Sequence, residues 1–198
     1  MVKLTIDGIQ VEAEKGTSIL HAAESVGIEV PTLCYIKDLL PDGSCRMCMV
    51  EIESRGRTKM ETACTAQVAE GLVVTTNSEK VRNARRNILD MLLSNHKTDC
   101  FSCPSNGDCK LQELCFEYGI ERTTYSGEQT ELPIDDSNKF FTYNPNLCIL
   151  CHRCVNTCHK IVGRGAIDTM ERGFDSAIGT PFHIDWADTN CESCGNCV

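Results

Sequence analysis

The sequence lacks the features of a membrane-spanning, a secreted or a nucleic-acid-binding protein. Its 198 residues contain no run of about 18 apolar residues, the length a membrane-spanning helix needs. The N-terminal segment Met1–Gly8 does not have the basic-then-apolar order of a secretory signal. The net charge of −9 argues against a basic face for phosphate groups. We therefore expect a cytoplasmic protein with no membrane span and no nucleic-acid partner.

Large apolar side chains are also scarce, whereas cysteine is abundant. Aromatic residues make up 6% of the chain, which has a single tryptophan, but 15 residues are cysteine. Without a secretory signal we expect a reducing compartment, which disfavours disulfides, and an odd number of cysteines cannot all pair. Small modules with small cores can be held together by bound metal instead. The cysteines are therefore predicted to be metal ligands.

The first 77 residues have the pattern of a small α+β unit. Turn and cap residues, together with alternating apolar residues, predict strands over Val2–Ile6 and Ile9–Ala13, a helix from Thr17 or Ser18 to Gly27, and strands over Met47–Glu53 and Leu72–Thr76. This order of elements is typical of a β-grasp, ferredoxin-like domain.

A longer helix is predicted from Ser78, its cap, to Asn95. We expect Arg82, Arg85 and Arg86 on its solvent face. The polar composition of residues 123–139 predicts a linker. These features divide the chain into domains at 1–77, 78–122 and 140–198.

The first cysteine group lies in the first domain and has the spacing Cys34-x10-Cys45-x2-Cys48-x15-Cys64. Small residues before Cys45 suit a loop that wraps a cluster and points backbone N–H groups at its sulfides. We expect a 2Fe–2S cluster here. A zinc site is the alternative, although zinc sites usually pair two Cys-x2-Cys knuckles and this group has one.

The second group has the spacing His96-x3-Cys100-x2-Cys103-x5-Cys109. Spacing alone leaves open whether these residues bind a cluster or a zinc ion with three cysteines and one histidine. Cys115 follows in a helical stretch and is interpreted as a buried free thiol. The other histidines have no ligand spacing and are interpreted as non-ligands: His21, His152, His159 and His183.

The third group contains the Cys-x2-Cys-x2-Cys pattern twice, as Cys148, Cys151 and Cys154 followed by Cys158, and as Cys191, Cys194 and Cys197. In two-cluster ferredoxins the fourth cysteine of such a run ligates the other cluster. Cys158 is therefore predicted to complete a 4Fe–4S site with the second run. The first run lacks its fourth ligand, which by this spacing would lie beyond Val198, so we expect that the chain continues.

Taken together, these groups resemble the N-terminal iron–sulfur region shared by several large oxidoreductases. These are the largest NADH-arm subunit of complex I, iron-only hydrogenases, the diaphorase subunits of NAD-linked hydrogenases, and NAD-linked formate dehydrogenases. The matching segments include Pro31–Cys34, Gly43–Cys48, His96–Gln112, Asn146–Cys151, Arg172–Phe174 and Cys191–Gly195. The resemblance implies a 4Fe–4S cluster at His96, Cys100, Cys103 and Cys109, and thus two to three 4Fe–4S clusters beside the 2Fe–2S cluster.

The implied fold is α+β: a β-grasp 2Fe–2S ferredoxin domain, a small helical domain with the histidine-plus-three-cysteine cluster, and a two-cluster 4Fe–4S ferredoxin-like domain. The implied function is a relay that passes single electrons between a flavin- and NAD(P)-binding partner subunit and a catalytic site, with no catalytic residue of its own. A ferredoxin is a further candidate partner. The catalytic site is expected to be that of an anaerobic formate dehydrogenase or of an iron-only, electron-bifurcating hydrogenase.

Two other functions are consistent with the residues. One is a stand-alone multi-cluster ferredoxin-like subunit of the diaphorase or complex I type. The other is a zinc-stabilised interaction module without a redox role. The sequence offers no complete dinucleotide fingerprint, because Gly163-x-Gly165 lacks a third glycine and a preceding strand. We therefore expect the nicotinamide site on a partner chain.

Overall fold

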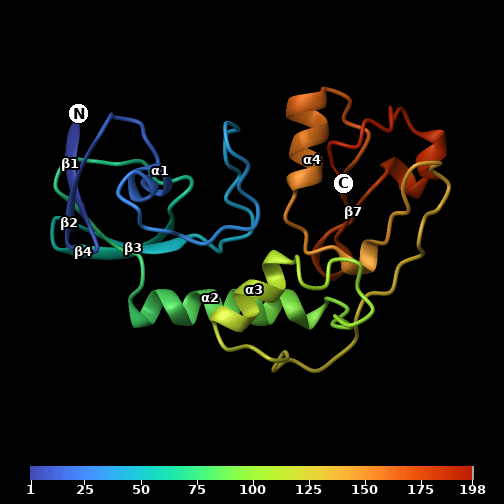
Figure 1. Ribbon diagram of the computed structural model, residues 1–198, viewed down its shortest axis with the longest axis horizontal. Helices are drawn as coiled ribbons and strands as arrows, with labels where there is room; N and C mark the ends of the chain where they lie inside the picture. The colour runs from blue at the N-terminus through green and yellow to red at the C-terminus, as the bar shows by residue number, and fades with distance from the viewer. Residues whose placement is uncertain (198) are drawn as a thin grey trace.

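The computed structural model describes residues 1–197, and its parts follow one another along the long axis of the molecule. A sheet unit lies at one end, two helices lie beneath it, and a unit with little regular structure forms the other end (Figure 1). The segment that leaves the sheet unit after Cys34 extends toward this third unit.

The N-terminal unit is a five-stranded mixed sheet with one short helix. Its strands are β1 (Val2–Ile6), β2 (Ile9–Ala13), β3 (Met49–Ser54), β4 (Arg57–Thr62) and β5 (Leu72–Thr75), in the spatial order β2-β1-β5-β3-β4. The central pair β1 and β5 is parallel, and every other pair is antiparallel. Helix α1 (Ile19–Glu24) begins at Ser18, whose hydroxyl accepts a hydrogen bond from the backbone of His21.

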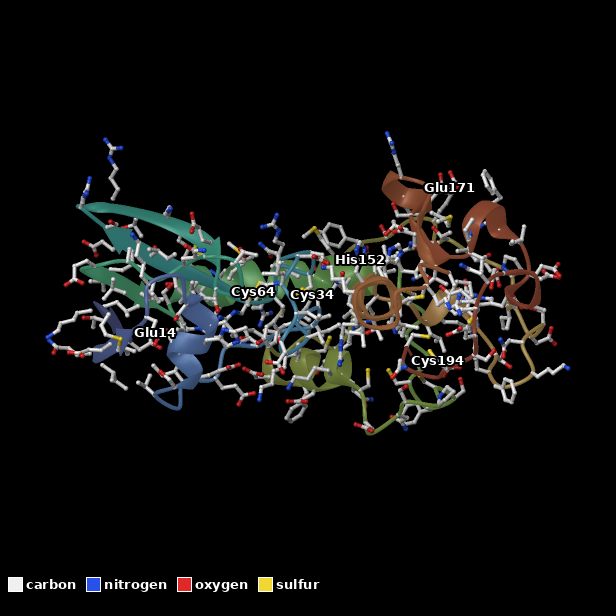
Figure 2. All side chains as sticks on the ribbon, turned by 90° about the horizontal axis from the view of Figure 1, so that it is seen from above. Glu14, Cys34, Cys64, His152, Glu171 and Cys194 are labelled. Atoms are coloured by element: carbon white, nitrogen blue, oxygen red, sulfur yellow. The ribbon has the colours of Figure 1, made fainter. Side chains whose placement is uncertain are left out.

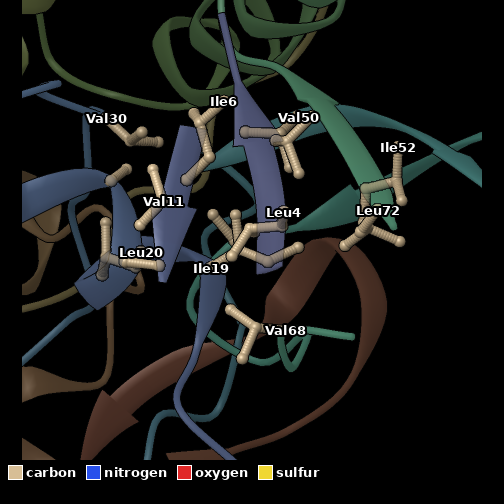
Figure 3. Close-up of a cluster of buried hydrophobic side chains, with 14 of the residues drawn as sticks. Leu4, Ile6, Val11, Ile19, Leu20, Val30, Val50, Ile52, Val68 and Leu72 are labelled. Atoms are coloured by element: carbon tan, nitrogen blue, oxygen red, sulfur yellow. The ribbon is translucent and has the colours of Figure 1, made fainter. Parts of the chain in front are cut away.

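The core of this unit lies between the sheet and α1 (Figure 3). Alternate residues of β1 point inward because side chains alternate across a strand, so Leu4 and Ile6 are buried while Lys3 is exposed. They pack with Ile19 and Leu20 of α1. Each such side chain contributes roughly 1.5–3 kcal/mol by leaving water. The expected α+β class is confirmed.

Within the sheet unit the elements differ from the prediction mainly in two places. Helix α1 ends at Glu24, and a turn then leads to Gly27, which has a left-handed φ of 77°. Strand β4 was not predicted, because Arg57–Thr62 is mostly polar. β4 lies at the sheet edge and pairs with β3 alone, so its side chains are largely solvated and carry no apolar alternation.

Two helices form the middle of the molecule. Helix α2 (Glu79–Ser94) begins at Ser78, whose hydroxyl accepts a hydrogen bond from the backbone of Val81, as predicted. Helix α3 spans Lys110–Glu117. Their shared apolar cluster also contains two residues of the sheet unit's first cysteine region and consists of Leu33, Met47, Leu89, Leu93, Leu111, Leu114, Cys115 and Tyr118. The sheet unit and the helices therefore share a core.

The prediction of a wholly solvated basic face on α2 is wrong for Arg85, which is 3% exposed. Its guanidinium donates from Nη2 to the carbonyl of Met49 at 2.8 Å and from Nη1 to the hydroxyl of Tyr118 at 2.9 Å. Arg82 and Arg86 are exposed, as expected. Helical spacing places Arg85 four residues after Val81 and four before Leu89, on the buried face.

The third unit has short elements only. Its strands are β6 (Asp168–Met170) and β7 (Ala177–Gly179), which are antiparallel. The helical pieces are η1 (Pro145–Leu147), α4 (Arg153–Asn156), the π-helical turn η2 (Thr157–Val162), η3 (Gly173–Asp175), η4 (Pro181–His183) and η5 (Trp186–Asp188). Trp186 is buried and packs edge-on against Phe141 at 5.0 Å between ring centroids.

The segment predicted as a linker packs against both of its neighbours. Asn95, at the end of α2, accepts a hydrogen bond at Oδ1 from the backbone of Thr130 at 2.7 Å. Asp135 accepts a hydrogen bond from the backbone of Trp186 at 2.9 Å. In the part of the chain that the structure describes, no helix has the length and hydropathy to cross a membrane.

Leu89 is fully buried in the shared core, whereas Met91 on the same helix is 55% exposed. We expect Leu89→Ala to lower the free energy of unfolding by about 2–5 kcal/mol, because it removes buried methyl groups and leaves a cavity. Urea denaturation of the cluster-loaded protein, followed by circular dichroism under anaerobic conditions, measures this loss. Met91→Ala is the control and should change stability by about 0.5 kcal/mol or less. Equal effects of the two substitutions would contradict the packing described here.

Candidate metal centres

The four cysteines of the first group lie together at the end of the sheet unit. Cys34, Cys48 and Cys64 are buried, and Cys45 is half-buried. They form two neighbouring pairs: a hydrogen bond from the Cys45 thiol lowers the pKa of Cys34, one from Cys64 lowers the pKa of Cys48, and the same contacts raise the pKa of Cys45 and Cys64. Deprotonated sulfur is the form that binds metal. The structure thus brings all four predicted ligands together.

The loop that carries Cys45 turns its backbone toward sulfur. Arg46 has a left-handed φ of 59°, and the next backbone N–H, that of Met47, lies 3.4 Å from Cys45 Sγ. Gly43 is also left-handed, with φ of 64°, and a Cβ there would lie 3.1 Å from Cγ2 of Thr65. The loop therefore needs glycine at position 43 for both its conformation and its close approach to Thr65.

The second group lines a cavity of about 560 Å³ between the end of α2 and α3. All four predicted ligands border it: His96, Cys100, Cys103 and Cys109. Burial lowers the pKa of His96, and its Nδ1 is buried without a hydrogen-bond partner. A neutral imidazole with a free ring nitrogen is the form that ligates metal. This unpaired buried nitrogen fits a histidine-ligated centre.

Cys115 also borders this cavity, although sequence spacing sets it apart from the group. It lies on α3 within the shared apolar core and is buried. Burial, with smaller contributions from the nearby Cys109 and Cys100, raises the pKa of its thiol to about 11. The buried thiol expected from the sequence is therefore present, and it stays protonated at neutral pH.

The two cysteine runs of the third group lie close to each other. Burial raises the pKa of Cys154 to about 12, with further contributions from Cys148, Cys151 and also Cys197 of the other run. Cys158 borders a second, narrow cavity together with Cys191, Cys194 and Cys197. The structure thus places Cys158 beside the second run, which is the arrangement that the crossover rule predicts.

Both runs repeat the same backbone turns. Leu150 and Ser193 are left-handed, with φ of 53° and 52°, and their N–H groups lie 3.4 Å from the sulfurs of Cys148 and Cys191, two residues earlier. His152 and Gly195 follow at equivalent positions and are left-handed too. The sequence repeat is therefore a repeat of conformation, with N–H groups directed at sulfur in each copy.

A polar contact joins the first group's loop to the third unit. Asp42 accepts a hydrogen bond from Lys160 Nζ at 2.9 Å and another from the Asn156 side chain. In Figure 2, seen from above, Cys64, Cys34 and His152 follow one another along the molecule, with Cys194 farther on. The contact of Asp42 with Lys160 could not be predicted, because a surface ion pair between distant segments has no local sequence signal.

The remaining histidines have hydrogen-bond partners of their own. His21 Nε2 lies 2.5 Å from the Tyr35 hydroxyl, and His159 Nε2 lies 2.9 Å from the Ile167 carbonyl oxygen. His152 is next to Thr169, and His183 is next to Glu171. Their interpretation as non-ligands stays a prediction.

The spacing of the thiols differs from that of a single-ion site. Within residues 1–197, no three His, Cys, Asp or Glu side chains converge closely enough to hold one metal ion. A zinc ion needs every donor at about 2.0–2.3 Å, whereas the irons and sulfides of a cluster hold the thiolates farther apart. Thiolates in groups of three or four are the donors that iron–sulfur clusters take.

Two family models match the chain. Residues 1–79 match a 2Fe-2S iron-sulfur cluster binding domain, and residues 85–124 match the iron-sulfur binding region of NADH-ubiquinone oxidoreductase-G. Among curated proteins, the chain is 42% identical over its whole length to the alpha subunit of the NADPH-Fe(3+) oxidoreductase of Geobacter sulfurreducens, of which it covers 23%. It is 37% identical to the NADP-reducing hydrogenase subunit HndD of Solidesulfovibrio fructosivorans, of which it covers 34%.

A solved structure of an NAD+-reducing [NiFe]-hydrogenase in the H2-reduced state superposes with a TM-score of 0.86 at 30% identity, over 96% of this chain and 80% of that one. The chain belongs to this family of iron–sulfur oxidoreductase subunits. Members of the family share the 2Fe–2S and 4Fe–4S cofactors that the cysteine groups predicted, and these cofactors are confirmed. The chain spans about a quarter to a third of the length of the curated relatives named here.

Gly43 and Gly27 both have a left-handed φ, but a Cβ at Gly27 would meet no atom within 4 Å. Alanine at either position costs about 1–2 kcal/mol in backbone strain. Gly43→Ala should cost more, because its Cβ would also press on Thr65 beside the first cysteine group. Anaerobic heating followed by visible absorption should show earlier loss of the 2Fe–2S chromophore in Gly43→Ala than in Gly27→Ala. The same midpoint for both variants would show that the approach to Thr65 is unimportant.

Proposed function

We propose that this chain is an electron relay that carries its clusters in series within an NAD(P)-linked oxidoreductase. The ligands assigned to the 2Fe–2S cluster are Cys34, Cys45, Cys48 and Cys64. The three 4Fe–4S sites are assigned to His96 with Cys100, Cys103 and Cys109; to Cys158 with Cys191, Cys194 and Cys197; and to Cys148, Cys151 and Cys154, which contribute three thiolates.

The observation that carries the proposal is the proximity of the cysteine groups to one another. The first group shares an apolar cluster with the second, since Cys45 and Cys109 both pack against it. The loop of the first group also contacts the third unit through Asp42 and Lys160. Each group is thus adjacent to another, as stepwise electron transfer requires.

Such a relay converts a two-electron transfer into one-electron steps. A nicotinamide gives up a hydride, and thus two electrons at once, while each cluster accepts one. A flavin- and NAD(P)-binding partner subunit is the proposed site where the pair is split. The protein sets each cluster potential through ligand type, burial and hydrogen bonds to sulfur. The backbone N–H groups that contact the sulfurs of Cys45, Cys148 and Cys191 supply such hydrogen bonds.

We infer a hydrogenase-type complex as the setting, on the likeness to hydrogenase subunits. The formate dehydrogenase setting stays a prediction from the sequence alone. The proposed domains are a β-grasp 2Fe–2S ferredoxin domain over 1–77, a helical domain over 78–122 and a two-cluster ferredoxin-like domain from 140 onward. Support for the first comes from its mixed sheet with a parallel central pair.

Metal analysis tests both the relay and its ligands. Anaerobically purified protein is expected to contain about 10 iron atoms at the three fully ligated sites, about three or four more where the three-thiolate site of Cys148, Cys151 and Cys154 is occupied, and a similar amount of acid-labile sulfide. Cys109→Ser should lose about four irons. Cys115→Ser, which changes the other thiol of the same cavity, should lose none. Zinc without sulfide would refute the relay, and equal iron loss in the two variants would refute the assignment of Cys109.

The ligand role of His96 has a separate test. His96→Cys is expected to keep the iron content but to lower the midpoint potential of one 4Fe–4S cluster, because a thiolate adds a negative charge to the ligand set. EPR-monitored redox titration measures the potential, and His183→Cys is the control at an exposed histidine. An unchanged spectrum and potential in His96→Cys would show that His96 is not a ligand.

A further inference from the structure

Arg85 is the one buried Asp, Glu, Lys or Arg side chain among residues 1–197. Both of its hydrogen-bond partners are neutral: the Met49 carbonyl and the Tyr118 hydroxyl. Its Nε is buried and has no partner. No carboxylate of the described residues forms an ion pair with it. The fold therefore holds a positive charge in its interior without a counter-ion from Asp or Glu.

Such an arrangement is costly unless negative charge lies nearby. Guanidinium groups remain protonated in proteins, and a buried, unpaired charge strongly destabilises a fold. Desolvation also strengthens every electrostatic interaction that the charge makes. The groups next to the two hydrogen-bond partners of Arg85 indicate where that negative charge lies.

Both hydrogen-bond partners of Arg85 lie near cysteine groups. Met49 directly follows Cys48, so the guanidinium is bound one residue away from a ligand assigned to the first cluster. Tyr118 packs in the apolar cluster against which Cys45 and Cys109 also pack, one cysteine from each of the first two groups. Arg85 thus lies where the sheet unit and the helices meet, between two sets of thiolates.

We propose that Arg85 is the internal counter-charge of the first cluster, and to a lesser extent of the second, and that it raises their reduction potentials. The proposal rests on the ligand assignments above. A cluster held by four thiolates is an anion, and reduction makes it more negative. A buried positive charge stabilises the reduced state more than the oxidised one. Arg85 touches no substrate and acts only through the electric field of its guanidinium at the clusters. It is therefore a positioning residue and not a catalytic one.

The size of the effect follows from Coulomb's law. A unit charge about 10 Å from a cluster, at an effective dielectric constant of about 20, changes a one-electron equilibrium by roughly tenfold. An exposed charge at a similar distance has much less effect, because water and salt screen it. Arg82, three residues earlier on α2, is exposed and hydrogen-bonds to Asn77. It provides a control with the same change of net charge.

The test compares Arg85→Gln with Arg82→Gln in the full, cluster-loaded chain. EPR-monitored titration gives the ratio of reduced to oxidised 2Fe–2S cluster at a fixed potential near the wild-type midpoint. We expect this ratio to fall about tenfold in Arg85→Gln and by less than about twofold in Arg82→Gln. An Arg85→Gln protein with full iron content and an unchanged ratio overturns the proposal and leaves the relay intact. Failure of the relay would instead appear as missing iron and sulfide in the wild type.

Arg85→Lys covers the case in which the glutamine variant does not fold. Lysine keeps the charge but loses the two-pronged geometry of the hydrogen bonds. At pH 6, where the ammonium group is protonated, the ratio should stay within about twofold of the wild type. A much larger change at that pH would mean that hydrogen bonding or packing, rather than charge, sets the potential, and would overturn the proposal.

Discussion

The contact of Arg85 with Met49 and Tyr118 is the interaction on which the relation between the sheet and the helices depends. It fixes α2 beneath β3 and places α3 against the region of the first cysteine group. Around it, one apolar cluster draws residues from both units, so the two helices complete their core with Leu33 and Met47 of the sheet unit. A chain with few aromatic residues can remain compact in this way, because metal ligands and core residues occupy the same loops.

The cysteine groups and most regular elements could be predicted from the sequence, because ligand spacing and strand alternation are local signals. Strand β4 could not, since its polar edge position hides the alternation. The burial of Arg85 could have been predicted from helical spacing, because Arg85 lies four residues after Val81 and four before Leu89, in the middle of the apolar stripe. Its charge argued for the solvent face instead. The contact of Asp42 with Lys160 joins segments more than a hundred residues apart, and a single sequence carries no record of it.

The third unit shows how little regular structure a ligand loop needs. Its conformation is set by left-handed residues at matching positions of two runs, which turn N–H groups toward Cys148 and Cys191. Glycine fills only one of these positions. Leu150, His152 and Ser193 adopt the same region at an energetic cost, which is typical of backbone held in place by a functional site.

The segment between Cys34 and Cys45 has a proposed ligand at each end and carries Asp42, which binds Lys160 and Asn156 of the third unit. With the proposed cluster bound, both ends of this segment would be held, and the Asp42 contact would link the first site to the third unit. Oxidative loss of that cluster would free both ends of the segment and with them the Asp42 contact. Loss of the first centre would then weaken the hold on its neighbour through this one contact.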